Sequence, residues 1–361
     1  MILGIDGREL VPGRGTGIKR FLSNLLLGVM QERPAWKLRL YSSEPMDRPA
    51  GLECEEVVMP SGPRLYWEQV ELPGRLRRDR VDFFFSPYLK APLRLPCPAA
   101  VTVHDLLYLS QPRYWLRPRD LCHNLYQLAQ GRLSCRRAAR VFTVSRYSRT
   151  ELLSWLGCSP EKVVLLRLGV EPSFHPGPVH DDAGVWKRHG LKPGYVLAVA
   201  NEKPHKNLDR LRRCHAALPL ALQQQHPLVL VGTGKTQEGC PWQRALGPCS
   251  EHAVPALYRG ADLVAVLSLA EGFGLPVVEA YASGVAVLCS ANGALREVGS
   301  GGAWMVDPRD DQAILAAMTR MLLAPTLREE CVARGLQSAA SYSWTETAKL
   351  FVRALEEASS L

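Results

Sequence analysis

The stretch ADLVAVLSLAEGFGLPVVEAYASGVAVLCS (residues 261–290) contains two apolar runs separated by a glycine-rich loop and a helical pattern. The runs, residues 261–268 and 284–290, are apolar on both faces over most of their length. Such runs are typical of strands in a parallel sheet that helices cover. Between them, Pro276 fits the first turn of a helix, where its missing N–H costs nothing. The stretch therefore predicts a strand–helix–strand unit of an α/β fold.

The same alternation extends in both directions along the chain. Residues 171–190 interrupt it with three prolines and mixed charge, and we interpret residues 173–190 as a linker. We predict two doubly wound α/β domains, at residues 1–172 and 191–342, and a final helix at residues 343–361 that packs toward the N-terminal domain. Nine further runs are predicted strands: residues 2–5, 38–42, 81–86, 99–105, 140–145, 162–169, 194–200, 226–232 and 303–307.

Length and composition limit the class of protein. The chain has 361 residues, which suits two domains, and its hydrophobic content of 47% is ordinary for a globular protein. No run approaches 18 apolar residues, and the N-terminus MILGIDG lacks the pattern of a signal peptide. The ten cysteines show neither a CxxC pair nor zinc-type spacing, and we interpret them as idle thiols in a reducing compartment. These features predict a cytoplasmic protein.

Positive charge is concentrated in the first half of the chain. Residues 1–170 hold 26 basic and 16 acidic residues, whereas residues 171–361 are nearly neutral. A basic N-terminal half suggests an anionic partner, which could be a membrane surface, an anionic lipid-linked acceptor or nucleic acid. A solvated arginine-rich surface is the alternative interpretation. No strand face interleaves aromatic and basic residues, which argues against nucleic acid.

Polar residues follow several predicted strands, where ligands of α/β proteins bind. His104 ends one apolar strand, and a hydrogen-bonded structural histidine is the alternative interpretation. Lys203 and Lys206 lie in a turn before a helix and could meet a phosphate, or form a solvated basic turn. The GRGTG loop (residues 13–17) opens a helix whose N-terminus would favour an anion, or it is a plain turn.

The glycine-rich loop of the opening stretch has the features of a sugar site. It leaves the amides of Phe273, Gly274 and Leu275 free to point at a ligand, and its glycines allow close approach to the backbone. Glu271 precedes these amides, and Glu279 follows about one helical turn into the next helix. Because a carboxylate can accept hydrogen bonds from two vicinal hydroxyls, the two acids and the amides suit a sugar.

The ordered set of motifs resembles family 4 retaining glycosyltransferases of the GT-B type, and within it the mannosyl- or rhamnosyltransferase-like group. The resemblance covers nearly the whole chain and implies two Rossmann-like domains that face each other across a cleft. The motifs that carry it are GIDGREL, GTGIKRFLSNLL, VTVHDLLYLSQP, FTVSRYSR, LAVANEKPHKNLDRL, LVLVG, LYRGADLVAVLSLAEGFGLPVVEAYASGVAV and YSWTETA.

The resemblance also implies roles for the residues. The donor is a GDP-, dTDP- or UDP-linked sugar held mainly by the C-terminal domain, with its base near residues 246–248. Many relatives have Arg–Lys where this chain has His205–Lys206, and Lys203 could supply the second phosphate contact. The resemblance implies that Glu279 contacts the ribose, and that Glu271 and the amides of Phe273, Gly274 and Leu275 contact the transferred sugar. It implies that Lys206 contacts the diphosphate, aided by Gly15, Thr16 and Gly17. It places His104 beside the reacting centre.

The implied reaction is transfer of a hexose, mannose or rhamnose, to a glycan or lipid-linked acceptor in polysaccharide biosynthesis. Family members retain anomeric configuration, and no D-x-D motif is present, so we expect neither a cofactor nor a metal. A nucleotide-sugar epimerase or sugar-phosphate synthase of the same fold, and a catalytically silent glycan-binding protein, are the alternatives. The basic N-terminal half could contact an anionic membrane.

Overall fold

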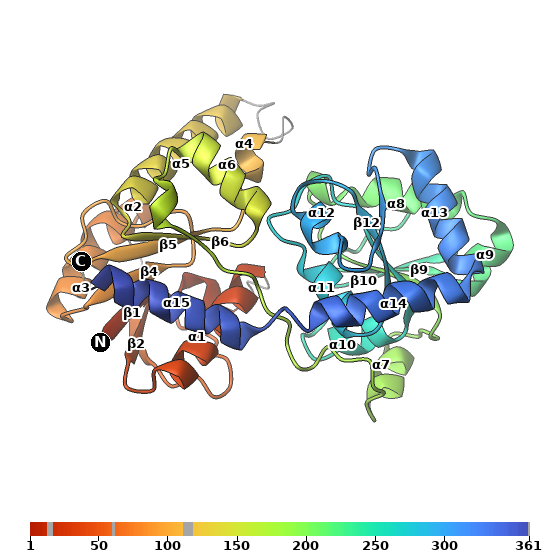
Figure 1. Ribbon diagram of the computed structural model, residues 1–361, viewed down its shortest axis with the longest axis horizontal. Helices are drawn as coiled ribbons and strands as arrows, with labels where there is room; N and C mark the ends of the chain where they lie inside the picture. The colour runs from red at the N-terminus through yellow and green to blue at the C-terminus, as the bar shows by residue number, and fades with distance from the viewer. Residues whose placement is uncertain (13–16, 60–61, 111–117, 360–361) are drawn as a thin grey trace. The chain divides into compact units, whose positions relative to one another are not determined.

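The computed structural model describes residues 1–12, 17–59, 62–110 and 118–359, with only the backbone for residues 118–120. Gly15 and Thr16 lie outside the described residues. The chain divides into two units (Figure 1). Unit 1 comprises Met1–Gly169 and Ser343–Leu361, and unit 2 comprises Val170–Tyr342.

Unit 1 is built on a parallel sheet of seven strands. Leu3 of the first strand lies between Leu38 and Phe83 of its two neighbours. Because β4 pairs with β1 on the side away from β2, the strand order reverses direction between β1 and β4. In sheet order the strands are β3 (Glu55–Val58), β2 (Lys37–Ser42), β1 (Ile2–Asp6), β4 (Phe83–Ser86), β5 (Ala99–Val103), β6 (Arg140–Thr143) and β7 (Val163–Leu165).

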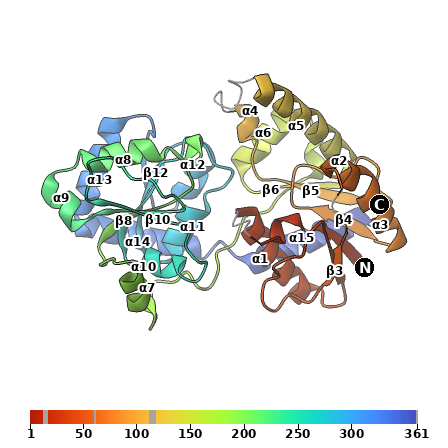
Figure 2. The same cartoon turned by 180° about the vertical axis from the view of Figure 1, so that it is seen from behind.

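Helices cover both faces of this sheet, with α1 and α15 on one face and α5 and α6 on the other (Figures 1 and 2). On the first face, the Phe351 ring of α15 lies 4.8 Å from that of Phe85 and 4.9 Å from that of Phe142. The helices are α1 (Gly17–Glu32), α2 (Arg64–Tyr66), the π-helix η2 (Trp67–Glu71), α3 (Leu72–Arg78), α4 (Leu107–Ser110), α5 (Pro118–Arg137), α6 (Arg146–Leu156) and α15 (Trp344–Ser359), with short 3-10 turns η1 (Arg8–Leu10) and η4 (Pro160–Lys162).

Close packing of α1 on α15 depends on a glycine. A Cβ placed on Gly28 of α1 would lie 2.6 Å from the Cβ of Ala348 in α15. The two helices therefore approach each other where neither carries a large side chain. This contact attaches the last helix of the chain to unit 1.

Unit 2 repeats the architecture with six parallel strands, and its strand order reverses direction between β8 and β11. In sheet order these strands are β10 (Gln243–Gly247), β9 (Leu228–Val231), β8 (Tyr195–Val199), β11 (Ala261–Val266), β12 (Ala286–Ser290) and β13 (Trp304–Val306). The helices are α7 (Asp182–Arg188), η5 (Pro204–Lys206), α8 (Leu208–Ala216), α9 (Leu220–Gln225), α10 (Val254–Arg259), α11 (Leu275–Ala282), α12 (Gly293–Gly299), α13 (Asp311–Leu323) and α14 (Pro325–Ala339).

The α/β fold with two Rossmann-like sheets is confirmed, and each of the eleven predicted runs contains a strand. The linker prediction for residues 173–190 is wrong, because this segment belongs to unit 2 and includes α7. Asp182 of α7 is 5% exposed and forms an ion pair of 2.7 Å with Arg259 of α10. No helix among the described residues is long and apolar enough to cross a bilayer.

Candidate functional site

In unit 2, Lys206 and Glu271 meet where the strand order reverses. Lys206 lies in the turn after β8, and Glu271 lies in the loop after the neighbouring strand β11. Nζ of Lys206 is 2.6 Å from Oε1 of Glu271, and the Ser268 hydroxyl donates to the same oxygen at 2.7 Å. Open α/β sheets bind ligands at this position, outside the carboxyl ends of the strands.

Asn207 fixes the turn that carries Lys206. Its backbone is left-handed, with φ of 58°, a conformation that asparagine tolerates better than most residues. Its side-chain amide donates to the carbonyls of Leu267 at 3.0 Å and Pro308 at 2.9 Å. These two bonds hold the turn against the segments that follow β11 and β13, so the position of Lys206 is determined by the fold.

The loop after Glu271 presents backbone donors at the start of α11. The N–H groups of Phe273, Gly274 and Leu275 donate to no acceptor among the described residues. Gly274 has φ of 113°, and a Cβ there would lie 2.7 Å from a methyl group of Leu295. The loop conformation therefore requires glycine at this position, because a residue with a side chain would be strained at this φ and its Cβ would collide with Leu295.

Glu279 is buried inside unit 2, with 2% of its surface exposed. The hydroxyl of Tyr258, from α10, donates to its Oε2 at 2.8 Å. Val277, Val278 and Tyr281, which share α11 with Glu279, are buried as well. Tyr258 is a partner that the sequence pattern did not identify.

Lys203 has an exposed side chain in the loop after β8, three residues before Lys206. The same loop is held at Glu202, whose carboxylate accepts from Arg212 at 2.5 Å and from the Thr233 hydroxyl. Arg212 is 4% exposed and also donates to the carbonyl of Lys235. The loops after β8 and β9 are therefore joined through one buried guanidinium group.

In unit 1, His104 follows β5 and its Nε2 lies 3.1 Å from the carbonyl oxygen of Pro87. A carbonyl can only accept, so Nε2 carries the proton and Nδ1 has a lone pair. The ring packs edge-on against Phe21 at 4.8 Å. Burial lowers the pKa of His104 to about 4, which keeps the imidazole neutral near pH 7. Gly17, the remaining predicted residue of this unit, is exposed at the start of α1.

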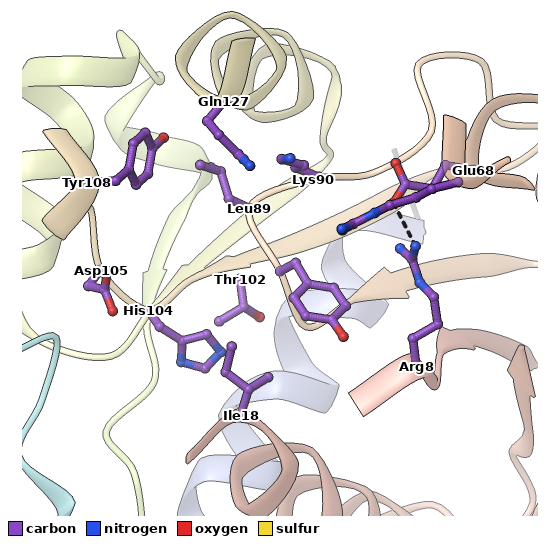
Figure 3. Close-up of a pocket in the computed structure, with 12 residues that line it drawn as sticks. Arg8, Ile18, Glu68, Leu89, Lys90, Thr102, His104, Asp105, Tyr108 and Gln127 are labelled. Atoms are coloured by element: carbon purple, nitrogen blue, oxygen red, sulfur yellow. Dashed lines mark hydrogen bonds and ion pairs between the residues drawn. The ribbon is translucent and has the colours of Figure 1, made fainter. Parts of the chain in front are cut away.

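His104 lines a pocket of about 260 Å³ that lies at the carboxyl ends of β1, β4 and β5 (Figure 3). Its charged lining includes Arg8, Arg64 and Lys90, none of which we predicted as site residues. Arg8 lies two residues after β1 in the motif GIDGREL, and a charged residue just after a predicted strand was a signal that the sequence offered. No group of three or more His, Cys, Asp or Glu side chains within the described ranges could hold a metal ion.

Comparison with known proteins identifies two family profiles along the chain. "Glycosyltransferase Family 4" matches residues 40–174, and "Glycosyl transferases group 1" matches residues 187–338. The chain is 30% identical over 280 residues to O-antigen chain mannosyltransferase B of Escherichia coli, with 74% of this chain and 72% of the relative covered.

A second relative is considerably longer than this chain. The chain is 26% identical over 274 residues to the serotype-specific mannosyltransferase WbdA of Escherichia coli, covering 72% of this chain but only 33% of WbdA. Among solved structures, sucrose-phosphate synthase from Thermosynechococcus elongatus superposes with a TM-score of 0.78 at 18% identity, covering 99% and 98% of the two chains. At that identity the superposition shows a shared fold.

Proposed function

The chain belongs to family 4 of the glycosyltransferases, and from this premise we propose that it transfers a hexose from a nucleotide diphosphate sugar to a glycan or lipid-linked acceptor. Mannose is favoured, because O-antigen chain mannosyltransferase B and WbdA are named for that sugar, and rhamnose is the second choice. The name of the first relative favours an acceptor in polysaccharide biosynthesis. We further propose that transfer retains anomeric configuration and needs no metal or other cofactor.

The contact between Lys206 and Glu271 carries the proposal for the donor site. Departure of a nucleoside diphosphate develops negative charge, which a preplaced ammonium group and backbone N–H groups stabilise. On binding, Lys206 exchanges its contact with Glu271 for the diphosphate. Glu271 then accepts from hydroxyls of the transferred sugar, beside the N–H groups of residues 273–275.

Two other residues have supporting roles in this proposal. Glu279, held by Tyr258, accepts from the ribose hydroxyls. His104 is neutral, and its Nδ1 accepts a hydrogen bond from a sugar hydroxyl in unit 1. In front-face attack the leaving phosphate takes the proton of the acceptor hydroxyl, so neither Glu271 nor His104 needs to act as a base.

Thermal-shift screening against GDP, UDP, dTDP and ADP and their sugars tests the donor assignment. The correct nucleotide should raise the melting temperature, since a ligand at a hundred times its dissociation constant stabilises the folded state by about 2.7 kcal/mol. The shift should shrink in Lys206→Met and persist in Lys192→Met, an exposed lysine before β8. If no nucleotide shifts the wild type, the donor site is wrong.

The products test the reaction class. With the identified donor and a mannan oligosaccharide, mass spectrometry should detect acceptor lengthened by one hexose, with the anomeric configuration of the donor in the NMR spectrum. An isomerised donor without transfer would indicate an epimerase instead. Activity that persists in a chelator supports metal independence, whereas loss that Mg²⁺ or Mn²⁺ restores contradicts it.

Peripheral membrane contact is a separate part of the proposal. The exposed arginines Arg77 and Arg78 at the end of α3, and Arg136 and Arg137 at the end of α5, form the densest basic clusters of unit 1. Each basic residue near an anionic surface adds about 1 kcal/mol. The chain should sediment with phosphatidylserine vesicles at low salt and should be released by replacing the four arginines with glutamine. Absence of binding at low salt would exclude the contact.

A further inference from the structure

We propose that the pocket of unit 1 binds an anionic group on the acceptor, a phosphate or a carboxylate, and that Lys90 is the residue that recognises it. The inference rests on the proposed function, which makes this pocket part of the acceptor site. Lys90 follows β4, and Arg8 follows β1, so the pocket lies where the strand order of unit 1 reverses. The ligand is recognised here by charge.

Of the three cations that line the pocket among the described residues, two have carboxylate partners. Arg8 forms ion pairs of 2.6 Å with both Asp6 and Glu68, and Arg64 forms one of 2.9 Å with Glu68 (Figure 3 shows the contact of Arg8 with Glu68). Glu68 lies in the π-helix η2, an irregularity frequent at functional sites. The carboxylates near these arginines are therefore already engaged.

Lys90 has no such partner. Its ammonium group makes no hydrogen bond or ion pair with any residue that the structure describes, and it lies 5.1 Å from the centre of the Tyr126 ring. Burial lowers the pKa of Lys90 to about 8, and repulsion from Arg64 and Arg8 adds to the effect while Glu68 opposes it. An anion in the pocket would offset this repulsion, so Lys90 is placed to receive one.

Two hydroxyl groups in the same pocket also lack partners. Oγ1 of Thr102, in a residue with no exposed surface, and Oη of Tyr108 make no hydrogen bond to the described part of the chain. Buried hydroxyls without partners are costly, and oxygens of a ligand would satisfy them. They supply polar recognition in addition to the charge of Lys90.

In this pocket, Lys90, which would recognise charge, and His104, near which the acceptor hydroxyl would react, lie on different sides. Figure 3 shows Lys90 and Gln127 at the upper side of the pocket, and His104 and Ile18 at the lower side. An acceptor with its hydroxyl near His104 would place a substituent toward Lys90. The substituent that fits there carries negative charge.

Lysine labelling of the intact chain tests this inference without requiring transfer. Because the lowered pKa leaves more of its amine unprotonated, Lys90 should react faster with acetic anhydride near neutral pH than exposed Lys37, as measured by mass spectrometry of peptides. Glucose 6-phosphate tests the phosphate source, glucuronic acid tests the carboxylate source, and methyl mannoside is the neutral control. Selective protection of Lys90 by either anion supports the proposal and identifies the source.

Equal labelling of Lys90 with and without both anions, or equal protection by the neutral sugar, would overturn the inference. A kinetic test then compares phosphorylated, uronate and neutral acceptors. Lys90→Met should lower kcat/KM for the anionic acceptor by about ten- to a hundredfold more than for the neutral one, and Lys90→Arg should retain the preference. In the wild type the preference should weaken as the pH rises through 8, whereas in Lys90→Arg it should not.

These outcomes separate the two proposals. If a nucleotide sugar is used but Lys90→Met treats anionic and neutral acceptors as the wild type does, only the inference about Lys90 fails. If no nucleotide binds while phosphate still protects Lys90 from labelling, the donor assignment fails and the anion pocket stands. Lys37→Met, at the amino end of the sheet of unit 1, is the matched control for the kinetic measurement.

Discussion

Nζ of Lys206 lies 2.6 Å from Oε1 of Glu271, across the point where the strand order of unit 2 reverses. Both side chains are largely buried, with 18% and 12% of their surfaces exposed. The cation and the carboxylate neutralise each other in the structure. In the proposed donor site, a nucleotide sugar has to break this ion pair, so recognition of the diphosphate by Lys206 would be coupled to recognition of the sugar by Glu271.

Glu271→Gln should lower kcat by about a hundred- to a thousandfold, because the amide keeps the shape of the carboxylate but not its charge at the reacting sugar. Binding of the nucleotide diphosphate alone should be retained, since Lys206 is then released from its partner. Steady-state kinetics and calorimetry measure the two effects. Glu55→Gln, at the start of the edge strand β3, is the control. A kcat within a few-fold of the wild type would exclude the assigned role.

Tyr258→Phe should weaken nucleotide binding by about three- to tenfold, since it removes one hydrogen bond that orients Glu279. The loss should disappear with a 2′,3′-dideoxynucleotide, which has no ribose hydroxyls for Glu279 to bind. Tyr195→Phe is a matched control, because Tyr195 is an equally buried tyrosine whose hydroxyl donates to the Leu257 carbonyl. Equal losses with both nucleotides would mean that Tyr258 has only a structural role.

His104 should make unit 1 sensitive to acid. Its pKa is about 4 in the folded chain and ordinarily 6.5, so the unfolded chain binds the proton more tightly. Stability is fully present above pH 6.5 and falls as the pH drops toward 4, by at most about 1.4 kcal/mol per pH unit. His104→Gln should reduce this slope in urea unfolding, whereas exposed His180→Gln should not. Identical slopes for wild type and His104→Gln would contradict the prediction.

Gly28→Ala should destabilise unit 1 by about 1–3 kcal/mol, because its Cβ would overlap that of Ala348. In a solvent-exposed helix the same change stabilises the fold by about 1 kcal/mol. A loss of stability instead of a gain would therefore show that α1 and α15 are in close contact at this position. Adding Ala348→Gly should recover most of the loss, and a double-mutant cycle measured by thermal unfolding gives the coupling energy. Additive effects would show that the helices adjust independently.

The sequence predicted the central strands better than the edges. Residues 2–5 and 261–268 are apolar runs in the middle of their sheets, whereas β3 (EEVV) and β10 (QRALG) are half polar because one side of each strand has no neighbour. The linker prediction failed for a related reason. The mixed charge of this segment includes Asp182, which is buried because it pairs with the distant Arg259 and accepts from the N–H of Val179.

The candidate site could also be predicted from the sequence only in part. Lys206 and Glu271 could be identified separately, since each follows an apolar strand, but their contact depends on which strands are neighbours. Asn207 and Tyr258 gave no local signal, because their partners lie 60 or more and 21 residues away. Lys90 is a single lysine in an ordinary loop. That it has no carboxylate partner in the described part of the chain becomes evident only when Arg8 and Arg64 are seen to share Glu68.

The return of α15 to unit 1 determines the order in which the chain can fold during synthesis. A ribosome that has released residues up to Tyr342 has completed unit 2, yet Phe85 and Phe142 of unit 1 still lack the ring of Phe351 that covers them. Domains usually fold in the order of their synthesis. Here the first unit to be made is the last to be completed, and its sheet must wait for about 170 residues of intervening chain with Phe85 and Phe142 still uncovered on the face that α1 and α15 share.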